Sequence, residues 1–187
     1  MMSQVHSKYA QQGSSLLEVL VTILILSFGL LALAGLSAAS LQYSKMAQYQ
    51  SVGTDLSAEF AERMRANVSA FSNGLYDKTS AYSTANVANA PACAANPCTS
   101  AEVAAKDTAA WLQMVRKRLP SGDAFIRRDA VNVLAADLWI MWQEPGLNVT
   151  DDASLSTSTK DGCPADAVKD LATTATAPRC MYFRISV

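Results

Sequence analysis

Glu18 is an ionisable residue in an unusual place, because it directly precedes an uncharged run from Val19 to Ser44. The first eighteen residues of that run are almost wholly apolar, which suits a segment that lies in a bilayer. An ionised carboxylate in hydrocarbon costs at least about 2.5 kcal/mol. A carboxylate at this place is therefore expected to have a function. The alternative is that Glu18 reaches the lipid headgroups and pairs with nothing.

The rest of the chain offers little for catalysis. Its only histidine, His6, lies before the apolar run, so the part that follows has no imidazole for Ser-His-Asp or Cys-His chemistry. No G-x-x-x-x-G-K-[ST] loop and no dinucleotide-binding fingerprint occurs. Asp151 and Asp152 are adjacent carboxylates in a polar stretch, where solvation or a calcium ion would explain them. We expect no enzyme activity and no cofactor.

The charges are nearly balanced, with 15 basic and 16 acidic residues. The basic residues are scattered, apart from Arg116 to Arg118 and the pair Arg127 and Arg128. A nucleic-acid interface needs a concentrated basic surface. We therefore expect no nucleic-acid partner.

The chain has four cysteines, and all of them follow the apolar run: Cys93, Cys98, Cys163 and Cys180. In an exported domain they would meet an oxidising compartment, which favours two disulfides. Three connectivities are possible, and proximity in the sequence favours Cys93 with Cys98 and Cys163 with Cys180. The alternative is a four-thiolate zinc site, but the spacings lack the C-x-x-C pairs that such sites commonly use. We expect no metal.

A long helix must carry both Glu18 and the apolar run. Beyond Ser44 there is no proline until Pro91, and four apolar residues recur every fourth position: Val52, Leu56, Phe60 and Met64. The pattern predicts one helix from Ser14 to about Asn67, roughly 80 Å long at 1.5 Å per residue. That length exceeds a bilayer, so the second half is expected to pack on a domain.

The remaining chain predicts a second helix and two long loops. Residues 69–100 are rich in Ala, Ser, Asn and Thr, and they read as a surface loop closed by the small disulfide. Asp107 to Leu119 has helical apolar spacing with basic residues in its last turn. Residues 148–178 are rich in Thr, Ser and Asp, and we expect them to form a loop tethered at Cys163 and Cys180.

Several segments indicate β-strands. The C-terminus alternates, with Met181, Phe183, Ile185 and Val187 on one side, as in a half-buried antiparallel strand. The three tryptophans, Trp111, Trp139 and Trp142, are expected to be core residues rather than a ligand platform. Three further strands are predicted from composition: Ala124 to Arg128, Val131 to Leu134 and Leu138 to Gln143.

The junction before the apolar run resembles the processing site of a type IV prepilin in Gly13, Ser14, Ser15, Leu16, Leu17 and Glu18. In that family a prepilin peptidase cuts after the glycine, the new first residue is usually N-methylated, and the fifth mature residue is a glutamate. The resemblance implies cleavage between Gly13 and Ser14, methylation of Ser14, and a role for Glu18 in subunit assembly. Most members carry Phe or Met where this chain has Ser14.

In the family, the glutamate is held to pair with the amino terminus of a neighbouring subunit. An adjacent carboxylate and ammonium recover much of the cost that each pays in a low dielectric. Cleavage after Gly13 would create that ammonium, so processing and assembly would be linked. Many major pilins carry a helix-breaking proline where this chain has Gly35. Gly29 and Gly35 would either allow similar local unwinding or let helices approach closely in the membrane.

The resemblance implies an α+β type IV pilin fold, with a long N-terminal helix, membrane-spanning in its first half, packed on a small antiparallel sheet. It divides the chain into a leader of residues 1–13, a transmembrane and assembly helix of residues 14–44, and a periplasmic pilin domain of residues 45–187. That domain would include the second half of the long helix.

Three later segments narrow the resemblance to the PilV group of minor pilins. Ala58 to Asn67 resembles the A-E-R-M-R-A-N signature of that group. Trp111 to Gly122 is similar to its Trp-bearing helix, which ends in Leu-Pro-x-Gly, and Trp139 to Glu144 is similar to a later strand. The group implies a structural subunit that primes type IV pilus assembly at or near the tip and supports twitching motility and adhesion.

The partners implied are other minor pilins, the major pilin, inner-membrane assembly proteins, the prepilin peptidase and a tip adhesin. The location implied is the inner membrane, as a single-pass protein with a periplasmic domain, and then the pilus. Two alternatives remain open: a minor pseudopilin of a type II secretion system, with the same anchor and fold, and a membrane-tethered binding domain.

Overall fold

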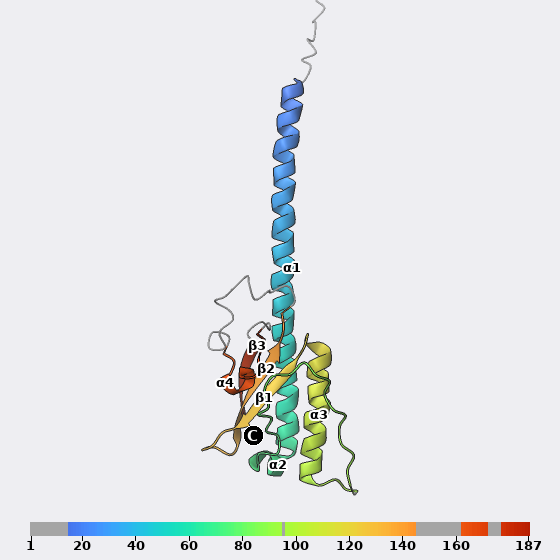
Figure 1. The fold of residues 1–187 in the computed structure, drawn as a ribbon, viewed down its shortest axis with the longest axis vertical. Helices are drawn as coiled ribbons and strands as arrows, with labels where there is room; N and C mark the ends of the chain where they lie inside the picture. Colours follow the sequence, from blue (N-terminus) through green and yellow to red (C-terminus); the bar gives the residue numbers. More distant parts are fainter. Residues whose placement is uncertain (1–14, 95, 145–161, 172–176) are drawn as a thin grey trace, which may run out of the picture. The chain divides into compact units, whose positions relative to one another are not determined.

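A computed structural model describes most of the chain, namely residues 15–94, 96–144, 162–171 and 177–187. The chain divides into two compact units, Met1–Lys45 and Met46–Val187. Helix α1 (Leu16–Ala66) belongs to both, since its first half lies in the first unit and its second half in the second (Figure 1). The prediction of one unbroken helix is confirmed.

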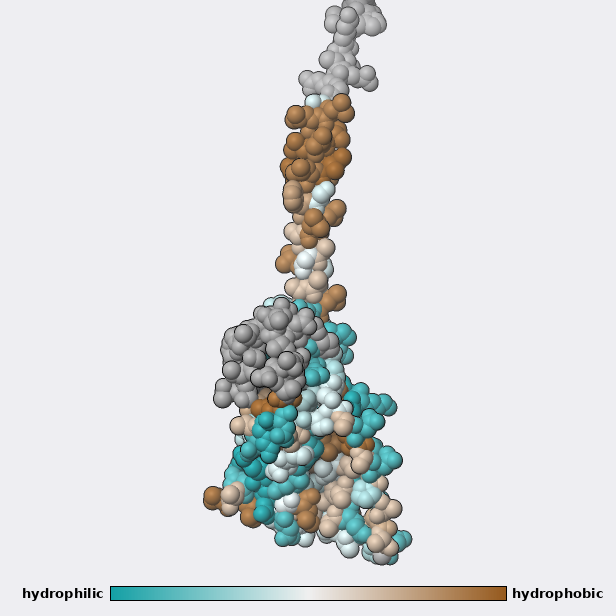
Figure 2. Space-filling view, viewed as in Figure 1, coloured by the Kyte–Doolittle hydropathy of each residue, from teal (hydrophilic) through white to brown (hydrophobic). Residues whose placement is uncertain are grey.

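The first half of α1 is an apolar helix with an exposed surface, brown in Figure 2. Hydroxyls within it donate to carbonyls of the preceding turn, as in Ser27 Oγ to Ile23 O at 2.7 Å and Ser37 Oγ to Leu33 O at 2.9 Å. Such bonds give these hydroxyls a partner where lipid offers none. Gly29 and Gly35 are helical, and a Cβ at either would meet nothing within 4 Å.

The second unit contains a three-stranded antiparallel sheet in the order β1-β2-β3. Its strands are β1 (Asp123–Arg128), β2 (Ala135–Trp142) and β3 (Arg179–Ser186). Leu138 of β2 lies opposite Ile126 of β1 and Phe183 of β3. In β3, Tyr182, Arg184 and Ser186 are exposed while Ile185 is buried, which confirms the predicted alternation.

The main core lies between this sheet, the second half of α1 and helix α3 (Ser100–Arg118). Phe60 of α1 stacks on Trp111 of α3 with ring centroids 4.1 Å apart. The Trp111 Nε1–H donates to Leu56 O at 2.9 Å. Of the predicted helix stripe, Leu56, Phe60 and Met64 are fully buried and Val52 is partly buried. The pilin-like α+β fold is thus the one expected.

A second, smaller cluster lies on the opposite face of the sheet. Phe125 and Met141 pack there against Tyr82 and against Ala167 of the short helix α4 (Ala165–Val168). Alternate strand residues face opposite ways, so these side chains point away from the core that contains Ile126 and Ile140. Both faces of the sheet are therefore covered in part.

Two predictions about helices need correction. Helix α3 begins at Ser100 rather than Asp107, because Thr99 and Glu102 form a capping box at its N-terminus. The segment predicted as a surface loop also contains helix α2 (Val68–Ser72). Phe71 and Tyr76 are buried there, so this part of the chain contributes to the core instead of only covering it.

The predicted strand from Val131 to Leu134 is wrong, because these residues form the turn between β1 and β2. Asp129 Oδ1 accepts the backbone N–H groups of Val131 and Asn132 at 2.8 and 3.0 Å. A side chain that bonds nearby backbone groups competes with strand pairing. Val131 is accordingly 95% exposed.

Candidate functional site

Glu18 lies exposed in the first turn of α1. Its N–H donates to Ser15 O at 2.9 Å, and its own carbonyl accepts the Thr22 hydroxyl at 2.7 Å. A carboxylate in the first turn also suits the helix dipole. Gly13 and Ser14, the expected cleavage and methylation residues, lie outside the described residues.

The helix beyond Glu18 is apolar on every side. Leu17 is 73% exposed and Phe28 is 66% exposed, and one face holds a hollow lined by Leu20, Ile23, Leu24, Ser27, Phe28 and Leu31. A helix that is hydrophobic all round belongs in lipid or among other helices. Within the described residues, this is the one helix long and apolar enough to cross a membrane.

Comparison with known families matches residues 8–34 to the prokaryotic N-terminal methylation motif. The match covers Gly13, Ser14, Glu18 and much of the apolar run. The chain therefore carries the N-terminal motif that is typical of type IV prepilins and pseudopilins. Neither curated proteins nor solved structures gave a match over the chain.

The motif carries expectations for processing and location. The prepilin motif implies processing by the prepilin peptidase and assembly with pilins or pseudopilins. The single N-terminal apolar helix agrees with an inner-membrane location before assembly into a pilus or pseudopilus. Pilin-like proteins are typically structural and non-enzymatic.

A polar network joins the second half of α1 to α3 and to the segment that follows α2. Arg63 contacts Glu59 Oε1 at 2.8 Å on its own helix and Asp107 Oδ1 of α3 at 3.2 Å. The Tyr76 hydroxyl donates to Asp107 Oδ2 at 3.0 Å. Burial, aided by this hydrogen bond, raises the pKa of Tyr76 to about 12, so its hydroxyl stays protonated and donating even above pH 10.

The C-terminal end of α1 is joined to two other elements. Arg65 pairs with Glu62 at 2.5 Å and also donates to Ser186 O at the end of β3. Asn67 Nδ2 donates to Ser100 O, the first residue of α3, at 2.8 Å. The segment that resembles the PilV signature is therefore a structural joint, where helix, strand and second helix meet.

Both disulfides in the structure follow the pairing expected from proximity. Cys93 and Cys98 have Cα atoms 5.4 Å apart, and Cys163 and Cys180 have theirs 5.1 Å apart. These distances lie within the normal range for disulfides. All four sulfur atoms are bonded to one another in pairs. Asp151 and Asp152, the considered calcium ligands, lie outside the described residues.

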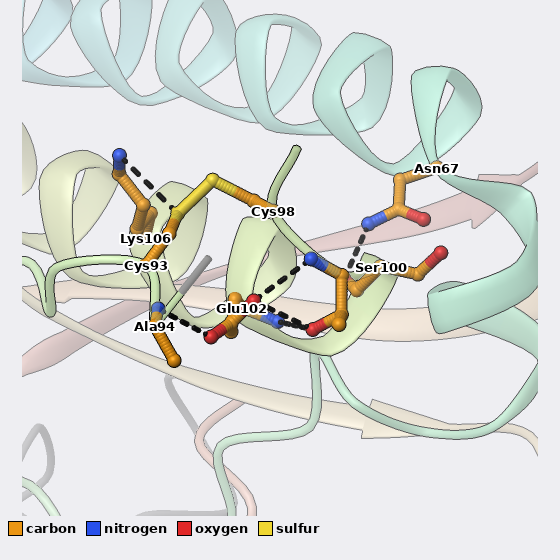
Figure 3. Close-up of a disulfide and its surroundings, with 8 residues drawn as sticks. Asn67, Cys93, Ala94, Cys98, Ser100, Glu102 and Lys106 are labelled. Carbon is orange, nitrogen blue, oxygen red and sulfur yellow. Dashed lines mark hydrogen bonds between the residues drawn. A yellow bond between two sulfur atoms is a disulfide. The ribbon is translucent and has the colours of Figure 1, made fainter. Parts of the chain in front are cut away.

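Sequence reasoning missed Glu102, which organises the surroundings of the first disulfide (Figure 3). Its carboxylate accepts the N–H groups of Ala94 and Thr99, both at 2.8 Å. These bonds, the Ala94 N–H first, lower the pKa of Glu102. The signal was present, since Thr-x-x-Glu from Thr99 to Glu102 is the pattern of a capping box.

Proposed function

We propose that this protein is a minor pilin of the PilV kind, a non-enzymatic subunit that primes type IV pilus assembly and lies at or near the tip. The observation that carries the proposal is a methylation motif on an apolar helix that is exposed over its first half. The second half of the same helix is the scaffold of a small folded domain. Such a molecule has one part for membrane and filament and one for specific contacts.

In this proposal, the prepilin peptidase cuts between Gly13 and Ser14, and Ser14 becomes the methylated first residue. Residues 14–44 then hold the subunit in the inner membrane, and residues 45–187 form its periplasmic domain. Glu18 pairs with the amino terminus of a neighbouring subunit. The pair sets the register along the filament, because each charge is strongly penalised in a low dielectric without the other.

The PilV assignment is supported by three sequence segments and by the contacts they make. Phe60 and Met64 are buried in the core, while Arg65 and Asn67 join α1 to β3 and α3. The proposed partners are other minor pilins, the major pilin, inner-membrane assembly proteins and a tip adhesin. Twitching motility and adhesion would then depend on the protein indirectly.

The role of Glu18 is tested by Glu18→Ala in the native host. Removing one member of a buried ion pair typically costs 3–5 kcal/mol, so we expect at least about a tenfold loss of the protein from sheared filaments. Cleavage after Gly13 should continue, as read by mass spectrometry of the mature N-terminus. Asp55→Ala, which removes an exposed carboxylate of α1 outside the PilV-like segment, is the matched control and should enter filaments normally. Normal incorporation of Glu18→Ala would refute the pairing.

A deletion of the gene separates the proposed pilus role from secretion. The methylation motif is shared with pseudopilins, which makes a minor pseudopilin of a type II secretion system the second candidate. Sheared surface pili and secreted enzyme activity are scored side by side. We expect pili to be lost with secretion unchanged. Loss of secretion alone would favour the pseudopilin, and no change in either would favour a tethered binding domain.

A further inference from the structure

The two disulfides of the domain lie in unlike surroundings. Cys163 is buried, while Cys180 is partly buried and packs against the smaller cluster that contains Phe125 and Met141. Cys93 and Cys98 both lie partly exposed beside the first turns of α3. A thiol in solution can therefore reach either sulfur of the Cys93–Cys98 bond, whereas at the other bond only Cys180 is partly exposed and Cys163 is buried.

A cation lies next to one sulfur of the exposed bond. Lys106 Nζ is 3.8 Å from Cys93 Sγ (Figure 3). Lys106 is four residues after Glu102, so both side chains project from the same face of α3 toward the disulfide. A nearby ammonium stabilises a thiolate, and a thiol of lower pKa is the better leaving group in disulfide exchange. Cys93 is therefore the sulfur that leaves most readily.

The carboxylate of Glu102 accepts a hydrogen bond from the residue that follows each cysteine. Glu102 Oε1 accepts the N–H of Ala94, which follows Cys93, and Oε2 accepts the N–H of Thr99, which follows Cys98. Neither bond involves a sulfur atom, so opening the disulfide removes neither of them directly. The two thiols would stay close together, and an intramolecular closure at high effective concentration would follow.

We propose that Cys93–Cys98 is a reversible thiol-exchange site, which a dithiol reductant opens and a disulfide oxidant closes without unfolding the domain. The reductant thiolate attacks Cys98 Sγ, the bond between the two cysteines breaks, and the electron pair leaves on Cys93 beside Lys106. The second thiol of the reductant loses its proton and attacks the mixed disulfide, which releases Cys98. The reductant departs as a disulfide, and two electrons and two protons have passed to the protein. Closure is the reverse.

Opening is tested on the full-length chain in detergent micelles, exposed to graded dithiothreitol, quenched with acid and alkylated with N-ethylmaleimide. Mass spectrometry then reports each cysteine separately. We expect Cys93 and Cys98 to be labelled at dithiothreitol concentrations at least about tenfold below those needed for Cys163 and Cys180. Simultaneous opening of both bonds, or earlier opening of the Cys163–Cys180 bond, would overturn the proposal.

The part played by Lys106 is tested by Lys106→Gln, with Lys117→Gln as the matched control. Lys117 is another exposed lysine of α3, in its last turn. We expect Lys106→Gln to slow opening about three- to tenfold, since the leaving thiolate loses its cation, and Lys117→Gln to open at the native rate. Equal rates for the two variants would overturn the assignment of Cys93 as the leaving group.

Reversibility is tested by Glu102→Gln, in which the amide nitrogen can no longer accept one of the two N–H groups. Oxidised dithiothreitol is added to the opened protein, and reclosure is followed by the same labelling. We expect Glu102→Gln to reclose several-fold more slowly than Glu62→Gln, the control on α1, because the two cysteines are held less closely. The Cys163–Cys180 bond reports in the same sample that the fold is intact. Reclosure at the control rate would overturn the role of Glu102.

Discussion

The two halves of α1 share one backbone but have opposite relations to their surroundings. In the first half, Leu17 and Phe28 are 73% and 66% exposed, and no side faces a protein core. In the second half, Leu56, Phe60 and Met64 are fully buried along one stripe, and charged residues take the other side. A uniform apolar surface suits lipid or a bundle of identical helices, whereas a stripe suits one fixed partner. Side-chain pattern alone therefore assigns the two halves to different environments.

The most direct test of this division truncates one large apolar side chain to alanine in each half of α1. Phe60→Ala should lower the free energy of unfolding of the domain by about 3–5 kcal/mol, because it removes the ring stacked on Trp111 and leaves a cavity. Leu24→Ala should change it by less than about 0.5 kcal/mol. Urea unfolding of the full chain in micelles, followed by near-ultraviolet circular dichroism, measures both. A loss of several kcal/mol in Leu24→Ala would break the comparison.

High pH should unfold the domain and leave the first half of α1 helical. Burial raises the pKa of both Tyr76 and Tyr82 to about 12 from 10.0. Above pH 10 the unfolded chain releases these protons while the folded chain keeps them, so stability falls by about 1.4 kcal/mol per pH unit for each tyrosine up to pH 12. Circular dichroism in micelles between pH 9 and 12 should show aromatic signal lost before the remaining helix signal.

Tyr82→Phe is the control for that titration. Phenylalanine keeps the ring in its cluster but has no proton to release, so the dependence of stability on pH should become shallower between pH 10 and 12. The hydroxyl that donates to Ser121 O is lost, which lowers stability equally at every pH below that window. An unchanged slope would show that Tyr82 does not contribute to alkaline unfolding.

The smallest effect comes from two glycines, one in each half. A Cβ at Gly53 would lie 3.4 Å from Met181 Sδ, an ordinary contact with a flexible side chain of β3, while a Cβ at Gly35 would meet nothing within 4 Å. Alanine is favoured over glycine in helices by about 1 kcal/mol. Gly53→Ala should therefore stabilise the domain by up to about 1 kcal/mol in urea unfolding, and Gly35→Ala should leave it unchanged. Destabilisation by Gly53→Ala would mean that β3 needs the closer approach that glycine allows.

The features that could be predicted from sequence are those with a repeating pattern. The four-residue spacing of Leu56, Phe60 and Met64 predicts the buried face of α1, and the alternation around Ile185 predicts β3. Trp111 and Trp142 are buried and Trp139 is partly buried, as expected of core residues. A buried face of a helix or strand needs apolar residues at a regular spacing, so these elements can be recognised in the sequence.

The features that were missed depend on single side chains. The turn from residue 129 to 134 has the aliphatic composition of a strand, and the carboxylate of Asp129 decides otherwise. The start of α3 is set by Thr99 and Glu102, before any apolar spacing begins. Asp107 of α3 contacts Arg63 of α1 and also Tyr76, and no local sequence pattern predicts contacts between residues so far apart in the chain. The expected cleavage residues, Gly13 and Ser14, stay predictions.

The positions of the tryptophans give the globular domain a fluorescence signal of its own. All three indoles of the chain, Trp111, Trp139 and Trp142, belong to the second unit, and the first has none. The indole of Trp111 is fully buried, with its N–H bonded to a main-chain carbonyl, so its emission should be blue-shifted in the folded state and move to longer wavelength on unfolding. Tryptophan fluorescence can thus follow the folding of this domain in reconstituted membranes, without a label and without a contribution from the apolar half of the helix.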